Sequence, residues 1–284
     1  MPERGNVLIT GATSGIGKAC ALQLSELGYR VYGTARNAPS IDELTASETK
    51  SGHDSVKLPY TLFRMDIRDE QSVRSGVSFI LEREGHIDAV VNNAAISVAG
   101  SVEEMTMAEV RDQVDTDLYG TLHVCRAVLP GMREQGKGLI VNVGSLAGVM
   151  AIPFQSIYSA CKSAVLGLSE ALQLEVEPFG IRIVVVEPGD TRTGFTANRR
   201  NTGGMASGSP YTERFKRVMA AASKSEQEGW PAEAVARKVV KIVGMRKPKF
   251  RYKPAMLLQR IGPMVRKIVP DRLFHQILAK FYDV

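Results

Sequence analysis

Short runs of aliphatic and β-branched residues recur along the chain, and longer stretches with helical periodicity separate them. The runs are Val7–Thr10, Arg30–Thr34, Leu62–Met65, Ala89–Asn92, Leu139–Val143 and Ile181–Glu187. Uninterrupted apolar runs are typical of strands buried on both faces, and intervening helices imply right-handed crossovers between parallel strands. The pattern predicts a doubly wound α/β fold, with one parallel sheet and helices on both of its faces.

The stretches between these runs predict helices at Gly17–Leu27, Gln71–Glu84, Met107–Gln135 and Ser156–Phe179. Gly28 and Gly180 follow the first and the last of them, as expected for glycines that end a helix. The segment Asn198–Pro210 has no apolar period, and its Gly, Ser, Asn and Pro residues predict a loop. This loop is either a mobile lid or a solvated connection.

The C-terminal segment has a different pattern. After Gly244, apolar residues alternate with basic ones, and Pro254, Pro263 and Pro270 interrupt the sequence. This pattern predicts two short amphipathic helices. We therefore divide the chain into a main domain at 1–244, in which a segment at about 190–230 shapes the substrate loop, and a basic amphipathic extension at 245–284.

The positive charge of the chain is concentrated near its C-terminus. The formal net charge is +6, and residues 237–284 carry 13 Lys and Arg residues against two Asp residues. One interpretation is that the apolar faces of this segment cover a cleft or meet a partner subunit, with the charges solvated. The other is peripheral membrane contact, because basic amphipathic helices bind anionic lipid surfaces. No nucleic-acid-binding module accompanies the charge, so no nucleic-acid partner is expected.

The cysteines and the apolar runs argue against several classes of protein. Cys20, Cys125 and Cys161 are scattered through predicted helices, which favours neither a disulfide framework nor a metal site. The N-terminus lacks the apolar run of a signal peptide, and no run reaches the about 20 residues needed to span a bilayer. We expect a cytoplasmic protein without a bound metal ion.

A glycine-rich turn, TGATSGIG at residues 10–17, joins the first predicted strand to the first predicted helix. In this context Gly11 permits a tight turn, Gly15 lets the backbone approach a pyrophosphate, and Gly17 lets the helix pack closely on the strand. The N-terminus of the helix offers N–H groups to the anion. The turn predicts a Rossmann-type dinucleotide site that also includes Thr13, Ser14 and Ile16.

The residue after the second predicted strand bears on the choice of dinucleotide. NAD enzymes place an acid there, which hydrogen-bonds the adenosine ribose. This chain has Arg36, whose planar set of donors suits a 2′-phosphate. Arg36 therefore favours NADP(H), and NAD(H) is the alternative if Arg36 only begins a solvated loop.

Ser145, Tyr158 and Lys162 supply a hydroxyl, a phenol and an ammonium for acid/base chemistry. Tyr158 and Lys162 are four residues apart, so they share one face of a helix. Reduction of a carbonyl needs a proton on its oxygen and a hydride on its carbon. Tyr158 is the expected proton donor, and the Lys162 charge is expected to lower its pKa from the usual value of about 10. Ser145 is expected to bind the substrate oxygen.

With these residues in this order, the chain resembles the short-chain dehydrogenase/reductase family up to about Phe195. Further matches to family motifs are Asp66 with Ile67, Asn93 and Ala94 in the NNAA sequence, and Pro188 with Gly189. The resemblance implies that Asp66 contacts the adenine. It also implies that Pro188, Gly189, Thr191 and Thr193 bind the nicotinamide side.

The sequence from Tyr158 to Gly189 is similar to the hydroxysteroid and retinol dehydrogenase branch of that family. One departure is Asp117, which stands where the family usually has Asn. The family's Asn binds a water that relays protons toward the lysine, and Asp117 is the expected fourth catalytic residue. An ionised Asp117 attracts Lys162 and weakens its effect on Tyr158, so we expect a shifted pH optimum. The resemblance further implies a homodimer or homotetramer.

The sequence thus predicts an NADP(H)-dependent oxidoreductase that interconverts a secondary alcohol and a ketone or aldehyde. Phe195, Met205, Tyr211, Phe215 and Met219 indicate an apolar pocket for steroid-, retinoid- or lipid-like substrates. The rival hypothesis is a dinucleotide-binding sensor with the same fold and no turnover. A sensor has no need of Ser145, Tyr158 and Lys162, so their presence favours an enzyme.

Overall fold

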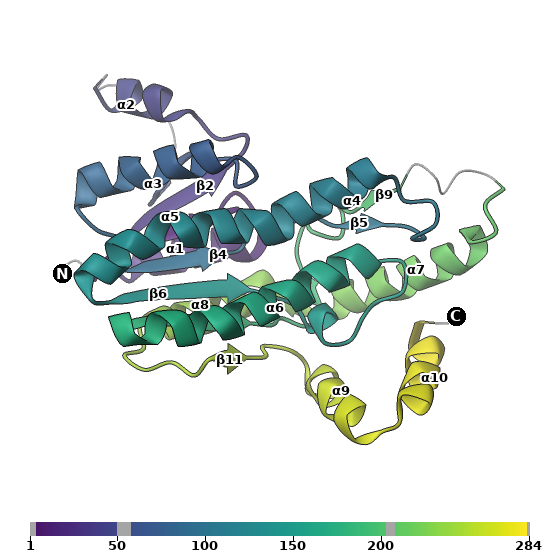
Figure 1. The fold of residues 1–284 in the computed structure, drawn as a ribbon. Coiled ribbons are helices and arrows are strands. Elements are labelled where there is room, and N and C mark those ends of the chain that lie inside the picture. The colour runs from purple at the N-terminus through teal and green to yellow at the C-terminus, as the bar shows by residue number, and fades with distance from the viewer. Residues whose placement is uncertain (1–3, 50–57, 203–207, 283–284) are drawn as a thin grey trace.

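The computed structural model describes residues 4–49, 58–202 and 208–282. Within these ranges the chain forms a seven-stranded parallel sheet in the order β11-β7-β6-β4-β1-β2-β3 (Figure 1). The strands are β1 (Asn6–Thr10), β2 (Arg30–Ala35), β3 (Thr61–Arg64), β4 (Ala89–Asn92), β6 (Gly138–Val143), β7 (Ile181–Val186) and β11 (Arg251–Tyr252). The doubly wound α/β fold and all six predicted strands are confirmed.

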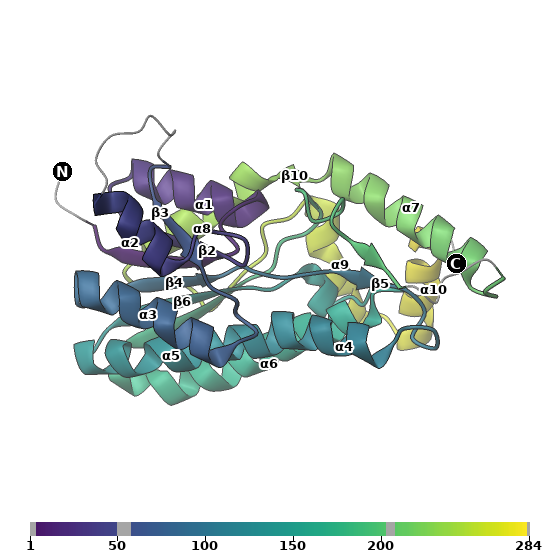
Figure 2. The same cartoon turned by 90° about the horizontal axis from the view of Figure 1, so that it is seen from above.

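Helices cover both faces of the sheet, with α1 and α8 on one side and α3, α5 and α6 on the other (Figure 2). The helices are α1 (Gly15–Glu26), α2 (Ile41–Thr49), α3 (Glu70–Glu84), α4 (Met107–Val114), α5 (Gly120–Gln135), α6 (Ser156–Val176), α7 (Thr212–Glu228), α8 (Ala232–Val243), α9 (Leu257–Ile268) and α10 (Asp271–Tyr282). The four predicted helices correspond to α1, α3, α4 with α5, and α6.

The two layers of core follow from the alternation of side chains along each strand. In β1, Val7 and Ile9 pack with residues of α1 and α8, whereas Leu8 packs with residues of α3, α5 and α6. All five residues of β1 are buried. Full burial of one aliphatic side chain contributes about 1.5–3 kcal/mol, which explains why uninterrupted apolar runs select the central positions of this sheet.

The seventh strand, β11, comes from the segment after residue 244. Arg251 pairs with Val185 and Tyr252 with Val186 at the edge of the sheet. The Arg251 guanidinium also forms an ion pair with the buried Glu187 carboxylate, which follows β7. The C-terminal segment therefore contributes a strand to the central sheet as well as two helices.

The region at 190–230 is more ordered than the loop that its composition predicts. It contains β8 (Thr191–Arg192), β9 (Arg200–Asn201) and the long helix α7. β9 pairs with β5 (Val98–Ala99), and β8 pairs with β10 (Trp230–Pro231). The predicted loop at 198–210 thus begins with a paired strand, and its residues 203–207 lie outside the described ranges.

The tail helices α9 and α10 form a V beside the end of the sheet at which the strands finish (Figure 1). Two amphipathic helices are confirmed, but the expected role of one proline is wrong. Pro263 lies inside α9 instead of separating helices, and it is buried there. Pro270 lies between α9 and α10, and Pro254 precedes α9.

Candidate active site

The glycine turn connects β1 to the N-terminus of α1. Gly11 and Gly15 have positive φ angles of 68° and 54°, which favour glycine. A Cβ at Gly17 would lie 2.3 Å from the Gly11 carbonyl oxygen, so helix and turn approach closely only because this residue is glycine. The Asn93 side chain, after β4, donates to the carbonyl oxygens of Thr10 and Gly11 at 2.9 and 3.1 Å. These hydrogen bonds hold the turn between the ends of β1 and β4.

The turn fits the phosphates of a dinucleotide. Ser14 precedes α1, and its side chain makes no capping hydrogen bond. Thr13, Ser14, Gly15 and Ile16 line the cavity at the N-terminus of α1, whose first N–H groups lack partners within the helix and are available to an anion. The cavity lies where the strand order reverses between β1 and β4, which is the usual place for a dinucleotide in such sheets.

Arg36 and Asp66 lie at the end of the cavity formed by β2 and β3, where the adenosine half of a dinucleotide would bind. Arg36 directly follows β2 and lines the cavity. The Asp66 carboxylate accepts hydrogen bonds from the Arg68 side chain, which lowers the Asp66 pKa. Arg68 also bonds Asp112, so it joins the β3 end to α4. Arg68 lines the same cavity, and no motif in the sequence identifies it.

Tyr158 and Lys162 project from successive turns of α6, and both are buried. The Lys162 Nζ atom lies 5.5 Å from the centre of the Tyr158 ring and donates to the Val143 carbonyl oxygen at 3.4 Å. Ser145 follows β6, and its Oγ atom accepts from the Ala147 N–H at 3.0 Å. A Cβ at Gly148 would lie 2.7 Å from the Lys162 backbone, so this glycine lets the Ser145 turn approach α6. Ser145, Tyr158 and Lys162 thus line the same cavity, as predicted.

Burial and neighbouring charges together set the pKa of Tyr158. Burial of the phenol is the largest effect and raises its pKa above the usual value. The Lys162 charge and a hydrogen bond with Ser145 lower it, as the sequence predicts, but they only partly offset burial. Asp117 and Glu226 oppose Lys162 because their negative charges disfavour the phenolate. The net effect raises the Tyr158 pKa.

Asp117 lies behind Lys162, in a π-helical turn (η1, Asp115–Tyr119) between α4 and α5. Its Oδ1 atom accepts from the Ile96 N–H at 3.0 Å, and its Oδ2 atom lies 3.5 Å from Lys162 Nζ. Oδ2 is buried without a hydrogen-bond partner among the described residues. Burial raises the Asp117 pKa, and the Lys162 charge opposes this effect. Burial alone would lower the Lys162 pKa, but Asp117 and Tyr158 reverse the shift and keep the ammonium charged.

The predicted nicotinamide-side residues follow β7. The Pro188 carbonyl oxygen accepts from the Leu146 N–H at 3.0 Å, which ties this turn to the Ser145 turn. Thr191 donates to the Gly189 carbonyl oxygen, and the Thr193 hydroxyl accepts from the Phe195 N–H. Both threonines line the cavity.

Asp190, in the same turn, connects it to two helices. The Asp190 carboxylate accepts from Ser225 of α7 and, at 2.5 Å, from Gln259 of α9. Burial raises the Asp190 pKa although these hydrogen bonds oppose the shift. Hydrogen bonds therefore attach α7 and the tail helix α9 directly to the predicted nicotinamide turn.

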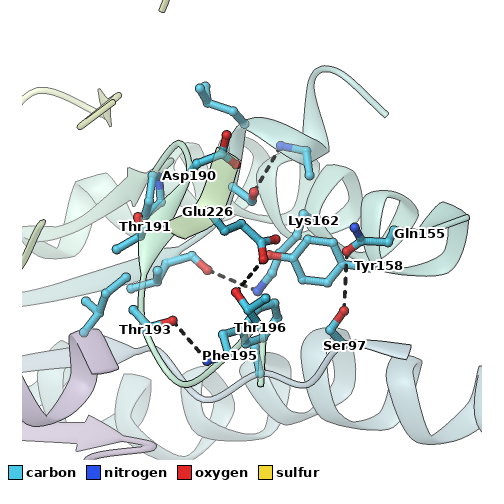
Figure 3. Close-up of a pocket in the computed structure, with 18 of the residues that line it drawn as sticks. Ser97, Gln155, Tyr158, Lys162, Asp190, Thr191, Thr193, Phe195, Thr196 and Glu226 are labelled. Atoms are coloured by element: carbon cyan, nitrogen blue, oxygen red, sulfur yellow. Dashed lines mark hydrogen bonds between the residues drawn. The ribbon is translucent and has the colours of Figure 1, made fainter. Parts of the chain in front are cut away.

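Polar residues that sequence reasoning missed surround Tyr158. Figure 3 shows Tyr158 between Ser97 with Gln155 on one side and Thr196 with Glu226 on the other. Gln155 is buried, and its Nε2 donor has no hydrogen-bond partner among the described residues. Glu226 accepts from Thr196 and pairs with the buried Arg199. Gln155 lies three residues before Tyr158, which could have identified it, whereas Glu226 reaches the site from a distant helix.

One cavity of about 1190 Å³ contains almost the whole predicted site. Among the predicted residues, Gly17 and Asp117 lie outside its lining, because Gly17 packs under the turn and Asp117 lies behind Lys162. The cavity continues from the glycine turn past Tyr158 to the tail helices, whose Leu258, Ile261, Val265, Phe274, Leu278 and other apolar side chains line it. The tail thus covers the cleft.

The predicted apolar pocket residues are only partly confirmed. Phe195 lines the cavity, and its ring centre lies 5.6 Å from that of Tyr158. Tyr211, Phe215 and Met219 are not part of the lining, because the first two rings pack against Phe154. Met205 lies outside the described residues.

Other predicted features concern metals, thiols and membranes. Across the described ranges, no group of His, Cys, Asp and Glu residues could hold a metal ion. Cys161, next to Lys162, is buried, and burial raises its pKa to about 12, so it is not a reactive thiolate. No helix in the described part of the chain is long and apolar enough to cross a bilayer.

Comparison with known proteins places this geometry in a family. Residues 5–203 match the model of the short chain dehydrogenases. The chain is 37% identical over 278 residues to a 3-ketodihydrosphingosine reductase from Bacteroides thetaiotaomicron, with 98% of each chain covered. It is 30% identical to dehydrogenase/reductase SDR family member 7B from Mus musculus, over 96% of this chain and 80% of that one.

Among solved structures, a short-chain dehydrogenase from Streptomyces avermitilis matches with a TM-score of 0.75 and 27% sequence identity. That match covers 98% of this chain and 96% of the other. The family match spans more than half of the chain and contains the glycine turn and the Ser145, Tyr158 and Lys162 set. The chain therefore belongs to the short-chain dehydrogenase/reductase family of oxidoreductases.

Proposed function

We propose that this protein is an NADP(H)-dependent reductase that converts a ketone on a long apolar chain into a secondary alcohol. The observation that carries the proposal is the position of Tyr158. It lies where the dinucleotide cleft meets an apolar channel that continues to the tail helices. Acid/base groups and a lipid-sized cavity therefore meet at one point.

The chemistry follows from the side chains around Tyr158. When bound, a reduced nicotinamide dinucleotide would supply the hydride for the carbonyl carbon. Tyr158 donates its phenolic proton to the carbonyl oxygen, so the ketone becomes an alcohol and a tyrosinate is left. Lys162 stabilises that tyrosinate, and the Ser145 hydroxyl stabilises the developing negative charge on the substrate oxygen. Burial raises the Tyr158 pKa and so favours the protonated phenol, which is the form that reduction consumes.

Arg36 supports NADP(H) as the dinucleotide. It lines the cavity directly after β2, where enzymes specific for NAD place an acid. Arg68 adds a second guanidinium to this part of the lining. A phosphate on the adenosine ribose would find cationic donors there, although Asp66 and Asp112 already engage Arg68.

The walls of the channel support a long-chain substrate. Beyond Tyr158 they consist largely of aliphatic and aromatic side chains from α9 and α10. The Bacteroides relative, whose similarity extends through these helices, is described as a 3-ketodihydrosphingosine reductase. We therefore place the substrate among long-chain 3-keto lipids.

The unpaired amide of Gln155 is evidence that the substrate carries a polar group close to its ketone. A buried amide donor without a partner costs about 1–3 kcal/mol, unless a ligand completes its hydrogen bond. The Gln155 Nε2 atom lies in the cavity lining one helical turn before Tyr158. A hydroxyl or other acceptor next to the reacting carbonyl would satisfy it.

The experiment is a screen for NADPH oxidation with 3-ketodihydrosphingosine, retinal, a ketosteroid and a series of aliphatic ketones of increasing length. We expect kcat/KM to rise about three- to fourfold for each CH₂ that the channel buries, with the long-chain 3-ketone the best substrate. Absence of NADPH oxidation with every compound would contradict the proposal. Equal rates for short and long chains would contradict the assignment of the channel.

A further inference from the structure

We propose that the outer faces of α9 and α10 dock onto an anionic lipid surface, from which the substrate enters the cavity. This inference rests on the proposed function for the nature of the substrate. Its physical basis is independent, because it comes from the exposed side chains of the two helices and from the position of the cavity mouth.

Exposed apolar side chains are concentrated on the tail. Eight of the sixteen large apolar side chains that are exposed among the described residues lie between Leu257 and Phe281. On α9 they form a stripe at helical spacing, consisting of Leu257, Ile261, Met264 and Ile268. On α10 the stripe is Leu273, Ile277 and Phe281. We call these seven residues the tail face.

The degree of exposure is high for such side chains. Leu257 is 72% exposed and Ile268 is 82% exposed. Exposed apolar side chains that gather on two successive helices of an otherwise well-packed protein indicate a site of interaction. Scattered single side chains would need no such explanation.

The mouth of the cavity lies on the tail face. The rim of the cavity is formed by side chains that line it and are nevertheless 41–77% exposed, namely Leu258, Ile261, Ile277 and Phe281. Phe274, on the same helix as two of them, is buried inside. An apolar chain that enters beside this rim passes from one apolar environment into another and avoids transfer through water.

The charges of α9 and α10 indicate which kind of surface the tail face binds. Arg260, Lys267, Arg272 and Lys280 are exposed on the same two helices, where Asp271 is the single acid within the described part. Two copies of the tail face would bring like charges together, which opposes self-association. An anionic bilayer offers complementary charge together with an apolar interior.

Contacts with the body of the protein hold α9 so that its stripe faces outward. Gln259 bonds Asp190, and the Arg266 guanidinium donates to the Val149 carbonyl oxygen. Pro263 is buried between these two positions. The side chains of Leu257, Met264 and Ile268 lie outside the cavity lining, so replacing them leaves the proposed catalytic site intact.

The test is co-sedimentation of the full chain with vesicles. We would use vesicles of equal parts phosphatidylcholine and phosphatidylglycerol, and vesicles of phosphatidylcholine alone. The variant is the triple substitution Leu257→Gln, Met264→Gln and Ile268→Gln. The matched control is Leu174→Gln on α6, because Leu174 is 74% exposed and far from the tail in sequence. Arg260→Gln with Lys267→Gln tests the charges.

We expect the wild type and Leu174→Gln to bind the anionic vesicles, and the triple variant to lose at least about tenfold in partitioning. Each removed cation should cost about fivefold, and high salt should weaken binding. Reduction of a short water-soluble ketone should be the same for all these proteins, which shows that the variants are folded.

Two results would overturn the proposal. One is wild-type protein that reduces a detergent-solubilised long-chain ketone but ignores anionic vesicles. The other is a triple variant that binds vesicles normally. If the wild type ignores vesicles and the triple variant also has a lower mass by light scattering, the face is an interface between copies. Vesicle binding without turnover on any ketone would leave this inference standing and contradict the proposed function alone.

Discussion

Replacing Asp117 by asparagine would remove a buried negative charge from the catalytic centre while nearly keeping the size of the side chain. Asp117 Oδ2 lies 3.5 Å from Lys162 Nζ, which lies 5.5 Å from the centre of the Tyr158 ring. The carboxylate is therefore no more than about 9 Å from the ring. At an effective dielectric constant of 20, two unit charges about 9 Å apart interact by about 1.8 kcal/mol.

The sign of the effect follows from the charge. Asp117 disfavours the phenolate and so raises the Tyr158 pKa. The asparagine variant should therefore have a lower Tyr158 pKa, because the negative charge that disfavours the phenolate is gone. Ketone reduction needs the protonated phenol, so its rate is lost as pH rises through that pKa. Alcohol oxidation needs the tyrosinate, so its rate appears as pH rises through the same pKa.

The assay is kcat/KM as a function of pH, for ketone reduction and for alcohol oxidation, at constant ionic strength. We expect the alkaline limb of reduction and the acidic limb of oxidation both to move to lower pH in Asp117→Asn. Asp115→Asn, in the same π-helical turn, is the control and should leave both limbs in place. Limbs that stay in place in Asp117→Asn, or that move to higher pH, would refute the reasoning.

Three further changes test separate parts of the structure. Arg36→Glu should lower kcat/KM for NADPH relative to NADH by about ten- to a hundredfold, because one charge-assisted hydrogen bond to the 2′-phosphate is lost. An unchanged ratio in steady-state kinetics would show that Arg36 does not bind the phosphate. Gln155→Leu should raise KM for the long-chain ketone about tenfold with little change in kcat, because one hydrogen bond to the substrate is lost. Arg251→Ala should lower the free energy of unfolding in urea by about 2–3 kcal/mol, because it leaves the buried Glu187 unpaired while Arg251 itself is partly exposed; Lys247→Ala, on the exposed chain before β11, should have no measurable effect.

The sheet could be predicted because its strands are selected by a local property. The strands β1, β2, β4, β6 and β7 each lie between two neighbouring strands, and they are largely apolar, as burial on both faces requires. β3 lies at the other edge, and its run is apolar only at Leu62 and the buried Phe63. The edge strand β11 consists of Arg251 and Tyr252 alone. It forms because the chain after α8 runs back along the unpaired edge of β7. Two residues are too few to show a hydrophobic pattern that predicts a strand.

The helices α7 and α8 were not predicted, although their apolar residues recur at helical spacing. In α8, Val235, Val239 and Ile242 recur at helical spacing and are fully buried. The same spacing relates Phe215, Val218 and Ala222 in α7. The glycines and prolines on either side of these segments are typical of loops, which masks the helical spacing between them.

The catalytic site was predictable where its residues are close in sequence and unpredictable where the fold brings them together. Tyr158 and Lys162 share a helix face, so their spacing is itself the signal. The π-helical turn that turns Asp117 toward Lys162 depends on a local change of hydrogen-bond register, which composition does not encode. Glu226 and Gln259 reach the site from helices far along the chain, and only the tertiary structure shows them near Tyr158 and Asp190.

The central claim is that Tyr158 donates the proton in a reduction driven by a nicotinamide hydride. The most direct measurement compares Tyr158→Phe with the wild type in single-turnover reduction of the long-chain ketone by NADPH, together with NADPH binding followed by fluorescence. Tyr119→Phe, on an exposed tyrosine, is the control. We predict that Tyr158→Phe loses about 10²–10⁴-fold in rate while it binds NADPH as the wild type does. A Tyr158→Phe variant that reduces the ketone at the wild-type rate would contradict the account.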